Sequence, residues 1–410
     1  MKILHTSDWH IGRNLYGRKR YDEFASFLTW LVRTISLNEI EVLLVAGDVF
    51  DTGTPSNKAQ RLYYQFLKEV SSTCCRHIII IGGNHDSPTL LEAPRELLRF
   101  FDVHVIGSTQ ENIEDEVIVL KNNTGEDELI VCAVPYLRDR DIRTSNAGED
   151  LDDKNRNLLN GIADHYKQVA DIAEAIQQQS RSSSLPIVAT GHLFAAGGTK
   201  VEGDGVRDLY VGSLVYVNSS SFPTCFDYLA LGHLHSSQLV GKNPVHRYSG
   251  SPLPMSFSEA KKSKCILQVD IEHGQTSVTE IQVPCFQELK SIRGDLKYIL
   301  EEIDTLITTE TPVWLEVIYD GEEIIANLQA TLADAISGSL IEILRILNNR
   351  LMRSVMQQNT PDHTLETMTQ ETVFEKCLEL HNIAESQQPE LLHLFRETIQ
   401  AIEDEDLRAE

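Results

Sequence analysis

The sequence predicts an α/β fold, and three observations lead to this prediction. Short apolar runs alternate with longer amphipathic stretches through the first two-thirds of the chain, as they do in proteins built from βα units. The runs are rich in β-branched residues and have no polar face, which is typical of strands buried inside a sheet. Several runs end in a turn that carries Gly together with Asp, Asn or His.

The expected elements follow this alternation from the N-terminus. The strands cover residues 3–4, 42–46 (VLLVA), 78–81 (IIII), 187–189 (IVA) and 228–231 (YLAL). The helical patterns cover residues 20–37, 56–71, 89–101 and 152–179. The polar stretches 107–130 and 244–283 predict hairpins, the first with its turn near residues 122–125.

Pro284 marks a predicted domain boundary, so the first domain is expected over residues 1–283. Beyond it, strands are expected at 288–293, 313–319 and 340–347, and helices at 295–308 and 322–337. These elements predict a small α+β domain over residues 284–360. Residues 361–410 are expected to form a helical segment that is broken at Pro389 and ends in an acidic tail.

The composition is that of a globular protein. Hydrophobic residues make up 41% of the 410 positions, and no apolar run approaches the ~18–20 residues of a membrane helix. No secretory signal is expected, because Asp8 and His10 interrupt the first apolar stretch. The seven cysteines include no CxxC pair, which argues against a disulfide framework or a zinc ribbon and favours a reducing cytoplasm.

Residues of the types that bind metal ions in proteins follow each of the predicted central strands. They are Asp8 and His10, Asp48, Asn84 with His85 and Asp86, His192, and His233 with His235. The carboxyl ends of strands in an open α/β sheet meet in one crevice, so we expect these side chains to gather there. A glycine precedes four of the groups and allows the chain to turn sharply beside an ion.

This mixture of imidazole and carboxylate groups suits manganese, iron or zinc. Two such ions can stabilise both the attacking and the leaving oxygen when a phosphate ester is hydrolysed. Asp48 is the natural carboxylate to bridge them. His85, with Asp86 beside it, is the candidate for protonating the leaving oxygen. Alternatively, Asp86 caps the helix that begins near Pro88.

These residues resemble the calcineurin-like metallophosphoesterase family, whose motifs occur here in order. They are DxH at 8–10, GD at 47–48, GNHD at 83–86, GH at 191–192 and GHxH at 232–235. Longer segments are similar to one branch of the family, the bacterial DNA nucleases that work with an SbcC-type ATPase. Those segments are SDWHIG at 7–12, AGDVFDTG at 46–53 and YSGSP at 248–252.

The resemblance implies a fold and a set of ligands. The fold is a β-sandwich flanked by helices, followed by a small capping domain and a C-terminal helical segment. The implied ligands are Asp8, His10 and His235 for one ion, Asn84, His192 and His233 for the other, and Asp48 as the bridge. His85 is implied to be the catalytic acid or to stabilise the transition state. Asp51 departs from archaeal and eukaryotic relatives, which carry histidine there, so its role is left open.

The resemblance also implies an activity and partners. The activity is Mn²⁺-dependent, with Mg²⁺ as the alternative, and hydrolyses DNA phosphodiesters. It comprises 3′→5′ exonuclease action on double strands, endonuclease action on single strands and hairpin opening, in replication, recombination and repair. The implied assembly is a homodimer in a heterotetramer with an SbcC-type coiled-coil ATPase, which the C-terminal segment binds. Its expected location is the nucleoid in the cytoplasm.

The acidic balance of the chain opposes DNA binding, because DNA is itself negatively charged. The net charge is −25, and the residues from Phe286 onward include 25 acidic but only nine basic positions. Local basic clusters are therefore the candidates for gripping a DNA backbone. They are Arg13, Arg18, Lys19 and Arg20, and then Arg138 and Arg140. Acidic neighbours leave a second interpretation open, in which each cluster is a solvated surface with local ion pairs.

Two other functions are compatible with these residues. A phosphodiesterase for a small molecule, such as a cyclic nucleotide, would share every ligand. A non-catalytic scaffold for the ATPase would need none of them. The segment GRNLYGRK at 12–19 mimics a phosphate loop, but Arg18 and Lys19 stand where Lys and Ser/Thr are required. We therefore expect no ATP site in this chain.

Overall fold

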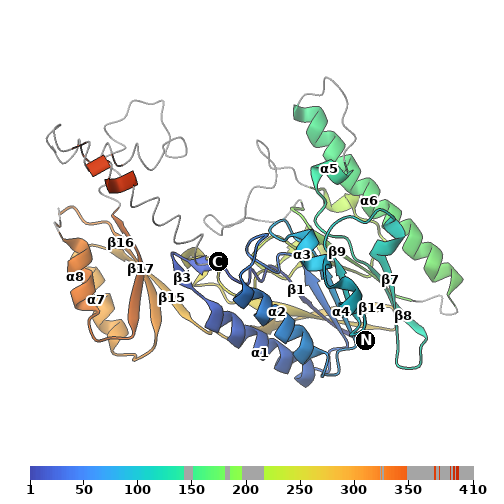
Figure 1. The fold of residues 1–410 in the computed structure, drawn as a ribbon, viewed down its shortest axis with the longest axis horizontal. Helices are drawn as coiled ribbons and strands as arrows, with labels where there is room; N and C mark the ends of the chain where they lie inside the picture. Colours follow the sequence, from blue (N-terminus) through green and yellow to red (C-terminus); the bar gives the residue numbers. More distant parts are fainter. Residues whose placement is uncertain are drawn as a thin grey trace. The chain divides into compact units, whose positions relative to one another are not determined.

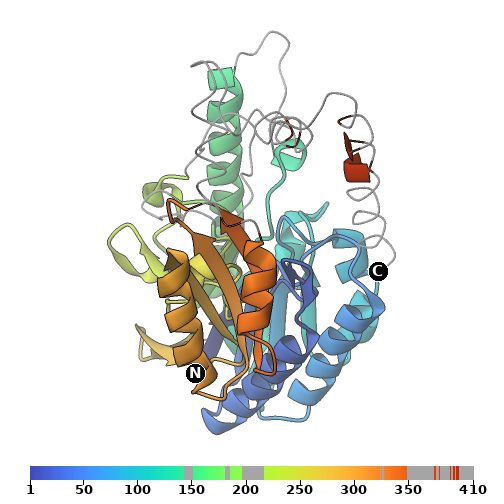
Figure 2. The same cartoon turned by 90° about the vertical axis from the view of Figure 1, so that its left-hand side faces the viewer.

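The computed structural model describes residues 1–142, 151–180, 185–195, 217–323, 325 and 327–348, together with eight positions from 374 to 396. The chain divides into two compact units, Met1–Phe286 and Gln287–Glu410. Figures 1 and 2 show the ribbon from two directions. Each unit is described by itself below.

The first unit contains two six-stranded sheets. The first has the order β14(Gln275–Gln282), β13(Cys265–Glu272), β1(Lys2–Thr6), β4(Val42–Ala46), β5(His77–Ile81), β6(Val103–Ile106). The second has the order β11(Gln238–Val240), β12(Asn243–Tyr248), β10(Tyr228–Gly232), β9(Ile187–His192), β8(Asp127–Cys132), β7(Val117–Lys121). In the first sheet β1, β4, β5 and β6 run parallel, and β13 and β14 pair antiparallel at one edge. In the second sheet β12, β10, β9 and β8 run parallel, and β11 and β7 pair antiparallel at the two edges.

The two sheets pack face to face through an apolar layer. Ile3, Leu44 and Ile79 from the first sheet lie in one buried cluster with Val188 and Ala230 from the second. Since strand side chains alternate between faces, their neighbours point outward and are covered by helices. Helices α1(Tyr21–Leu37) and α2(Asn57–Val70) cover the first sheet, and α6(Leu151–Gln179) covers the second. The predicted sandwich flanked by helices is confirmed.

The expected helix over residues 89–101 is wrong. Two short helices occupy this region, α3(Pro88–Glu92) and α4(Arg95–Arg99). Pro94 separates them, because proline has no N–H to donate and its ring crowds the preceding turn. Ser87 rather than Asp86 caps α3, since the Ser87 side chain accepts a hydrogen bond from the backbone N–H of Leu90.

The first predicted hairpin forms, and the second forms over only part of its predicted range. The first pairs β7 with β8 after the short helix η1(Ile113–Glu116), and Gly125 takes a positive φ of 84° in its turn. The second, expected over residues 244–283, is limited to β13 and β14, which pair over eight residues each. Residues 243–248 instead form β12 of the second sheet. A further small hairpin joins β2(Asn14–Leu15) to β3(Arg18–Lys19), close in sequence to the first pair of predicted ligands.

The second unit contains a three-stranded sheet. Its order is β15(Glu288–Gly294), β16(Val313–Tyr319), β17(Ile341–Asn348), with all neighbours parallel. Helices α7(Leu296–Ile307) and α8(Leu328–Ala335) connect the strands. A strand that returns through a helix runs parallel to its predecessor, so this domain is α/β rather than the expected α+β type. The helix expected over 322–337 is shorter than predicted.

Most of the expected helical segment at 361–410 lies outside the described residues, which include only eight of its positions. The predicted domain bounds at 284 and 361 therefore stay predictions. Among the residues that the structure describes, no helix is long and apolar enough to cross a membrane.

Candidate metal centre

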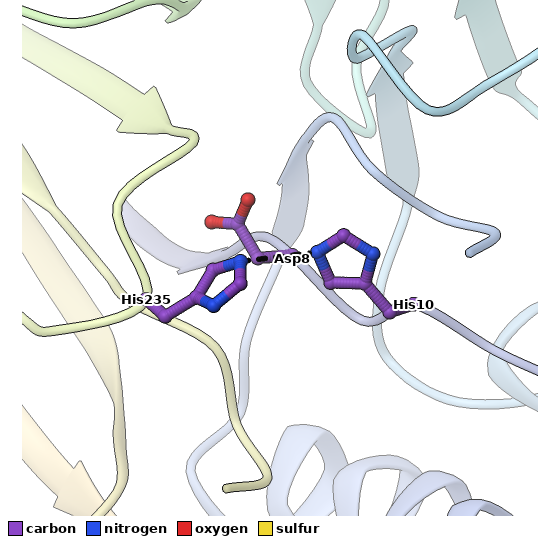
Figure 3. A group of neighbouring side chains, drawn as sticks. All are labelled: Asp8, His10 and His235. Carbon is purple, nitrogen blue, oxygen red and sulfur yellow. Dashed lines mark hydrogen bonds between the residues drawn. The ribbon is translucent and has the colours of Figure 1, made fainter. Parts of the chain in front are cut away.

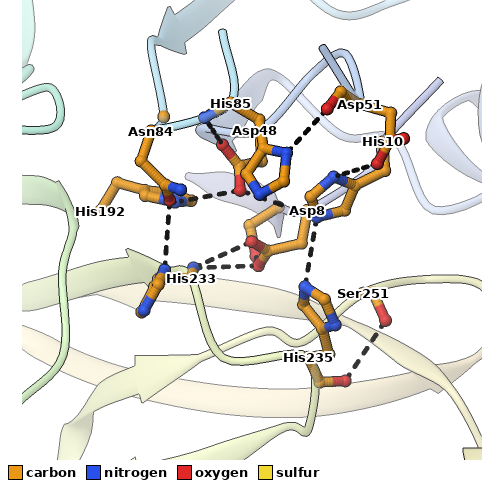
Figure 4. A network of polar contacts seen from close by, with 12 residues as sticks. Asp8, His10, Asp48, Asp51, Asn84, His85, His192, His233, His235 and Ser251 are labelled. Carbon is orange, nitrogen blue, oxygen red and sulfur yellow. Dashed lines mark hydrogen bonds and ion pairs between the residues drawn. The ribbon is translucent and has the colours of Figure 1, made fainter. Parts of the chain in front are cut away.

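The predicted ligands meet where the strands of both sheets end. Figure 4 shows side chains that follow β1, β4 and β5 in the first sheet beside side chains that end β9 or follow β10 in the second. The histidines and aspartates among the candidate ligands are all buried. They are Asp8, His10, Asp48, His192, His233 and His235. Asn84 is half-buried. The sequence prediction that these groups share one crevice is confirmed by their contacts.

The backbone at these positions is unusual. Asp8, His10, Asp48 and His233 have positive φ angles of 52°, 48°, 49° and 100°. Such conformations cost non-glycine residues on the order of 1–3 kcal/mol each and persist only when surrounding contacts enforce them. Here the backbone N–H of Asp8 donates to the carbonyl of Gly47, and that of His10 donates to the carbonyl of Asp48, each at 3.0 Å. These bonds hold the first two loops in register.

Glycine is required where the loops come closest together. A Cβ atom on Gly83 would lie 2.2 Å from Oδ1 of Asp48, and one on Gly232 would lie 1.9 Å from the carbonyl oxygen of Ala46. No side chain fits at either place. The glycine before each motif therefore allows the approach of the loops, as the sequence predicted.

The first group of potential ligands is Asp8, His10 and His235, shown in Figure 3. Their donor atoms all lie within 4.8 Å of one another. The Nε2 atoms of His10 and His235 lie 3.2 Å apart and face each other. Both carboxylate oxygens of Asp8 accept the backbone N–H of His233, at 2.9 and 3.1 Å, which fixes the carboxylate plane.

The second group contains His192, His233 and Asn84. Oδ1 of Asn84 lies 3.0 Å from Nε2 of His192 and 3.3 Å from Nδ1 of His233. The other ring nitrogen of His192, Nδ1, donates to the carbonyl of Ala46 at 2.9 Å. A backbone carbonyl in this place is the usual outer contact of a metal-binding histidine, because it aims the opposite nitrogen at the ion.

Asp48 lies between the two groups. Its Oδ2 atom is 3.6 Å from Nε2 of His10 and 3.3 Å from Nε2 of His192. Burial alone would raise the pKa of Asp48, but His192 and His10 together hold it well below its usual value. Asp48 is therefore ionised and placed where a carboxylate could bridge two ions.

The charges of the site fit divalent cations. Burial opposes protonation of His192, yet the negative charge of Asp48 raises the pKa of His192 to about 9. In the metal-free protein, the extra proton on His192 therefore balances the charge of the buried carboxylates, a role that a bound cation would otherwise have. Nitrogen and oxygen donors from histidine, aspartate and asparagine suit first-row divalent metals.

His85 lies against this centre. Its backbone N–H donates to Oδ1 of Asp48 at 2.9 Å, and its Nδ1–H donates to the carbonyl of Asp51 at 2.7 Å. The second bond fixes the tautomer and leaves Nε2 free. The His85 ring meets the His10 ring edge to face, with centroids 4.8 Å apart.

Asp51, whose role the sequence left open, supports the same two histidines. Its carboxylate lies 3.3 Å from Nδ1 of His10 and 3.1 Å from Arg13, while its carbonyl holds His85. Burial opposes ionisation, but His10 and Arg13 lower the pKa of Asp51 to about 2. The carboxylate thus orients the His10 ring, a contact that histidine at this position could not make in the same form.

Comparison with known proteins gives this geometry a family. A model described as "Calcineurin-like phosphoesterase" matches residues 1–237, which contain every potential ligand named above. The chain is a calcineurin-like phosphoesterase. A second model, described as "Type 5 capsule protein repressor C-terminal domain", matches residues 285–382.

Three relatives, each named as the SbcD subunit of the nuclease SbcCD, match this phosphoesterase. The protein of Escherichia coli K12 is 36% identical over 405 residues, covering 98% of each chain. The protein of Bacillus subtilis 168 is 32% identical over 416 residues, covering both chains completely. The Rhodobacter capsulatus protein is 34% identical over 281 residues, or 67% of each chain. The phosphoesterase belongs to the same family as these nuclease subunits along its full length.

Asp86 of the phosphoesterase holds two loops together. Its carboxylate accepts backbone N–H groups of Val49, Phe50 and Gly83 at 3.1, 2.9 and 2.9 Å. Burial and the charge of Asp48 raise the pKa of Asp86 to about 7, against the effect of these donors. These contacts are those of a positioning residue. Its predicted catalytic role stays a prediction.

A buried polar cluster behind His235 was not predicted. Nδ1 of His235 lies 3.6 Å from Glu259, and Glu259 pairs with Lys264. Lys264 also donates to the carbonyl of His235 at 2.9 Å and to Ser251 at 2.8 Å. Ser251 belongs to the YSGSP segment, so a signal for it was present. Nothing in the spacing of Glu259 and Lys264 points to a ligand more than 20 positions away.

The predicted DNA-contacting residues differ in exposure. The prediction that Arg20 contacts DNA was wrong, because its side chain is buried and donates two hydrogen bonds to Glu23, at 2.8 and 3.0 Å. Arg18 and Lys19 are exposed on the small β2–β3 hairpin. Arg13 pairs with Asp51. In the second cluster, Arg138 is half-buried and Arg140 is exposed and pairs with Asp141 at 3.3 Å.

Proposed function

We propose that this phosphoesterase is the nuclease subunit of an SbcCD-type complex and hydrolyses phosphodiester bonds in DNA. The observation that carries the proposal is the position of Asp48 between two buried groups of potential ligands. The full-length similarity to proteins named as nuclease subunits supports DNA as the substrate.

Two divalent ions occupy the centre in this proposal. Asp8, His10 and His235 would hold one, Asn84, His192 and His233 would hold the other, and the Asp48 carboxylate would be shared by both. Mn²⁺ is the proposed metal and Mg²⁺ the alternative, because the histidine-rich donor set favours the softer ion. When bound, the ions supply positive charge that stabilises the attacking and leaving oxygens of the phosphodiester.

His85 is the proposed general acid. The Asp51 carbonyl holds its Nδ1–H, so Nε2 is the atom that faces the substrate. A protonated Nε2 would donate to the leaving oxygen, which is a step worth about 10²–10⁴-fold in rate for a well-placed acid. Asp86 keeps the loops that carry Asp48 and His85 at a fixed separation.

The proposed reactions are 3′→5′ exonuclease action on double strands, endonuclease action on single strands and hairpin opening, during replication, recombination and repair. Arg13, Arg18 and Lys19 lie near the first ligand pair in sequence and are the proposed phosphate contacts, with Arg138 and Arg140 as a second set. The acidic balance of the chain supports a partner that supplies most of the affinity for DNA.

We propose an SbcC-type coiled-coil ATPase as that partner. Residues 361–410 would bind its coiled coil, residues 284–360 would form the capping domain, and two copies of each chain would make a heterotetramer at the nucleoid. The similarity of the whole chain, including the matched C-terminal region, to subunits of SbcCD supports this assembly.

Cleavage of an end-labelled DNA hairpin tests the proposal. The phosphoesterase would be assayed with its ATPase partner, with and without Mn²⁺, beside His85→Ala and the control His273→Ala, which changes an exposed histidine in the β13–β14 turn. We expect Mn²⁺-dependent cutting by wild type and control, and a loss of about 10²-fold or more in His85→Ala.

Two results would contradict the proposal. Hydrolysis of a simple phosphodiester without any cutting of DNA would point to a small-molecule substrate. Binding of the ATPase without hydrolysis of either substrate would point to a scaffold.

A further inference from the structure

A further cluster of potential ligands lies at the amino ends of β5 and β6, whereas the metal centre described above lies at the carboxyl ends of the strands. It consists of His77, Asp102 and His104, whose donor atoms all lie within 4.8 Å of one another. His77 begins β5, Asp102 directly precedes β6, and His104 is the second residue of β6. The register pairs Ile79 with His104, so His77 and His104 project from the same face of the sheet.

The tautomer of His77 is determined by its environment. Its Nε2 atom lies 2.9 Å from the carbonyl oxygen of Lys121, and a carbonyl can only accept, so Nε2 carries the proton. In the neutral ring this tautomer leaves a lone pair on Nδ1. This Nδ1 atom is buried and has no hydrogen-bond partner, while only 8% of His77 is exposed. A buried polar atom without a partner is rare in folded proteins and calls for an explanation.

The other two members of the cluster complement this lone pair. Burial, together with His77 and the nearby Arg99 and Arg95, lowers the pKa of His104 against the opposing effect of Asp102. His104 is therefore neutral at pH 7 and can donate a lone pair. Asp102 supplies a negative charge from an exposed position, which offsets the two arginines and leaves the cluster open to solvent.

We propose that His77, Asp102 and His104 form a separate metal site that binds Zn²⁺ or a similar first-row transition ion. Two imidazoles and one carboxylate, with a fourth position open to water, are a common set of zinc ligands. Mg²⁺ and Ca²⁺ fit less well, because they prefer sites built of oxygen atoms. The Lys121 carbonyl behind His77 is the outer contact that metal-bound histidines usually have.

The proposed ion has a structural role. Lys121 ends β7, the edge strand of the second sheet, whereas β6 is the edge strand of the first. The ion would join β5 and β6 and, through His77, hold them beside β7. His77 and Asn84 lie at the two ends of β5 and its following loop. At about 3.3 Å per residue, this stretch of chain spans about 20 Å. The site is therefore outside the catalytic centre.

Zinc binding by the full-length protein tests this site. Bound zinc would be counted by elemental analysis after dialysis against limiting Zn²⁺, in wild type, His104→Ala, Asp102→Asn and the control His273→Ala. The same changes would be made in a His192→Ala background, in which the catalytic centre has lost a ligand. We expect His104→Ala to bind one zinc ion fewer than wild type and control in both backgrounds.

The affinity and the activity provide further readouts. Loss of even an outer contact weakens metal sites by about 10–100-fold, so we expect Asp102→Asn to weaken zinc binding by at least about tenfold. Mn²⁺-dependent cleavage by His104→Ala should stay within about twofold of wild type, which also shows that the variant folds. Equal zinc content and affinity in wild type, His104→Ala and Asp102→Asn would overturn the proposal.

Discussion

The two ends of strand β5 hold polar side chains in different ways. At its carboxyl end, the loop with Asn84 and His85 meets loops from four other strands, and neighbouring ligands sit on backbone with positive φ. At its amino end, His77 and His104 occupy regular strand positions. The carboxyl end is a network in which each group depends on several others. The amino end is a small cluster that a single ion could complete.

This comparison teaches where substitutions should matter. A change at the carboxyl end removes an interaction on which several ligands depend, so it should abolish catalysis while the apolar layer between the sheets still folds. A change at the amino end should leave catalysis nearly unaltered. The predictions below test this difference, beginning with the largest expected effect.

Asp48→Asn should reduce DNA cleavage by at least about 10³-fold. The substitution removes the charge that faces both groups of ligands, and several kcal/mol of metal-supplied stabilisation depend on it. Asp102→Asn is the matched control, because it makes the same chemical change at the other end of the strands. Single-turnover cleavage rates of the two variants provide the comparison. Similar cleavage rates for Asp48→Asn and Asp102→Asn would contradict the proposed difference between the two ends of the strands.

The metal-free protein should lose stability as the pH rises. His192 has a folded-state pKa of about 9, above its ordinary value of 6.5. The protonated ring therefore adds its full contribution to the free energy of unfolding below pH 6.5, and this contribution is lost as the pH rises through 9. The loss amounts to about 3 kcal/mol, at about 1.4 kcal/mol per pH unit. Urea unfolding in a chelating buffer at pH 6 and pH 9.5 measures it. His192→Asn should lose about 3 kcal/mol less than wild type over this range, and an equal loss in both proteins would contradict the assignment.

Lys264→Met should weaken activity at limiting Mn²⁺ by about 10–100-fold, the usual effect of losing an outer contact of a metal ligand. Lys264 bonds to Glu259 and to the carbonyl of His235, so its loss leaves that histidine poorly oriented. The exposed neighbour Lys262 is the control, and Lys262→Met should change activity less than twofold. The measurement is the Mn²⁺ concentration that gives half-maximal cleavage. An unchanged value for Lys264→Met would show that this cluster does not support the centre.

Arg18→Ala should have the smallest effect. Arg18 is exposed on the β2–β3 hairpin, and a phosphate contact there contributes affinity but no chemistry. We expect KM to rise about two- to fivefold with kcat unchanged, and the salt dependence of binding to fall by about one unit of slope. Arg99→Ala, an exposed change on α4, serves as the control. A fall in kcat with unchanged KM would contradict a binding role.

The sequence allowed the site to be predicted better than its surroundings. Each ligand follows a strand directly, and parallel strands present their carboxyl ends at one edge, so a local pattern was enough to place Asp8, Asp48 and His192 together. The two helices in place of one at residues 89–101 show the opposite case, because Pro94 interrupts a pattern whose apolar spacing continues across it.

Burial and contacts that arise only in the folded chain explain what sequence reasoning missed. Arg20 has the appearance of a surface cation until the fold buries it against Glu23. Asp51 and Lys264 acquire their roles from the histidines they meet in space, at distances along the chain that no local motif records. The parallel sheet of the second unit was also missed, although the expected alternation of strands and helices over residues 288–347 is the pattern of parallel βαβ units.

Electron paramagnetic resonance of the Mn²⁺-loaded protein tests the central claim most directly. Two ions bridged by Asp48 are predicted to give an exchange-coupled spectrum at two Mn²⁺ per chain, and Asp48→Asn should convert it to the spectrum of isolated ions. An uncoupled spectrum in the wild-type protein at full metal loading would contradict a bridged two-metal centre.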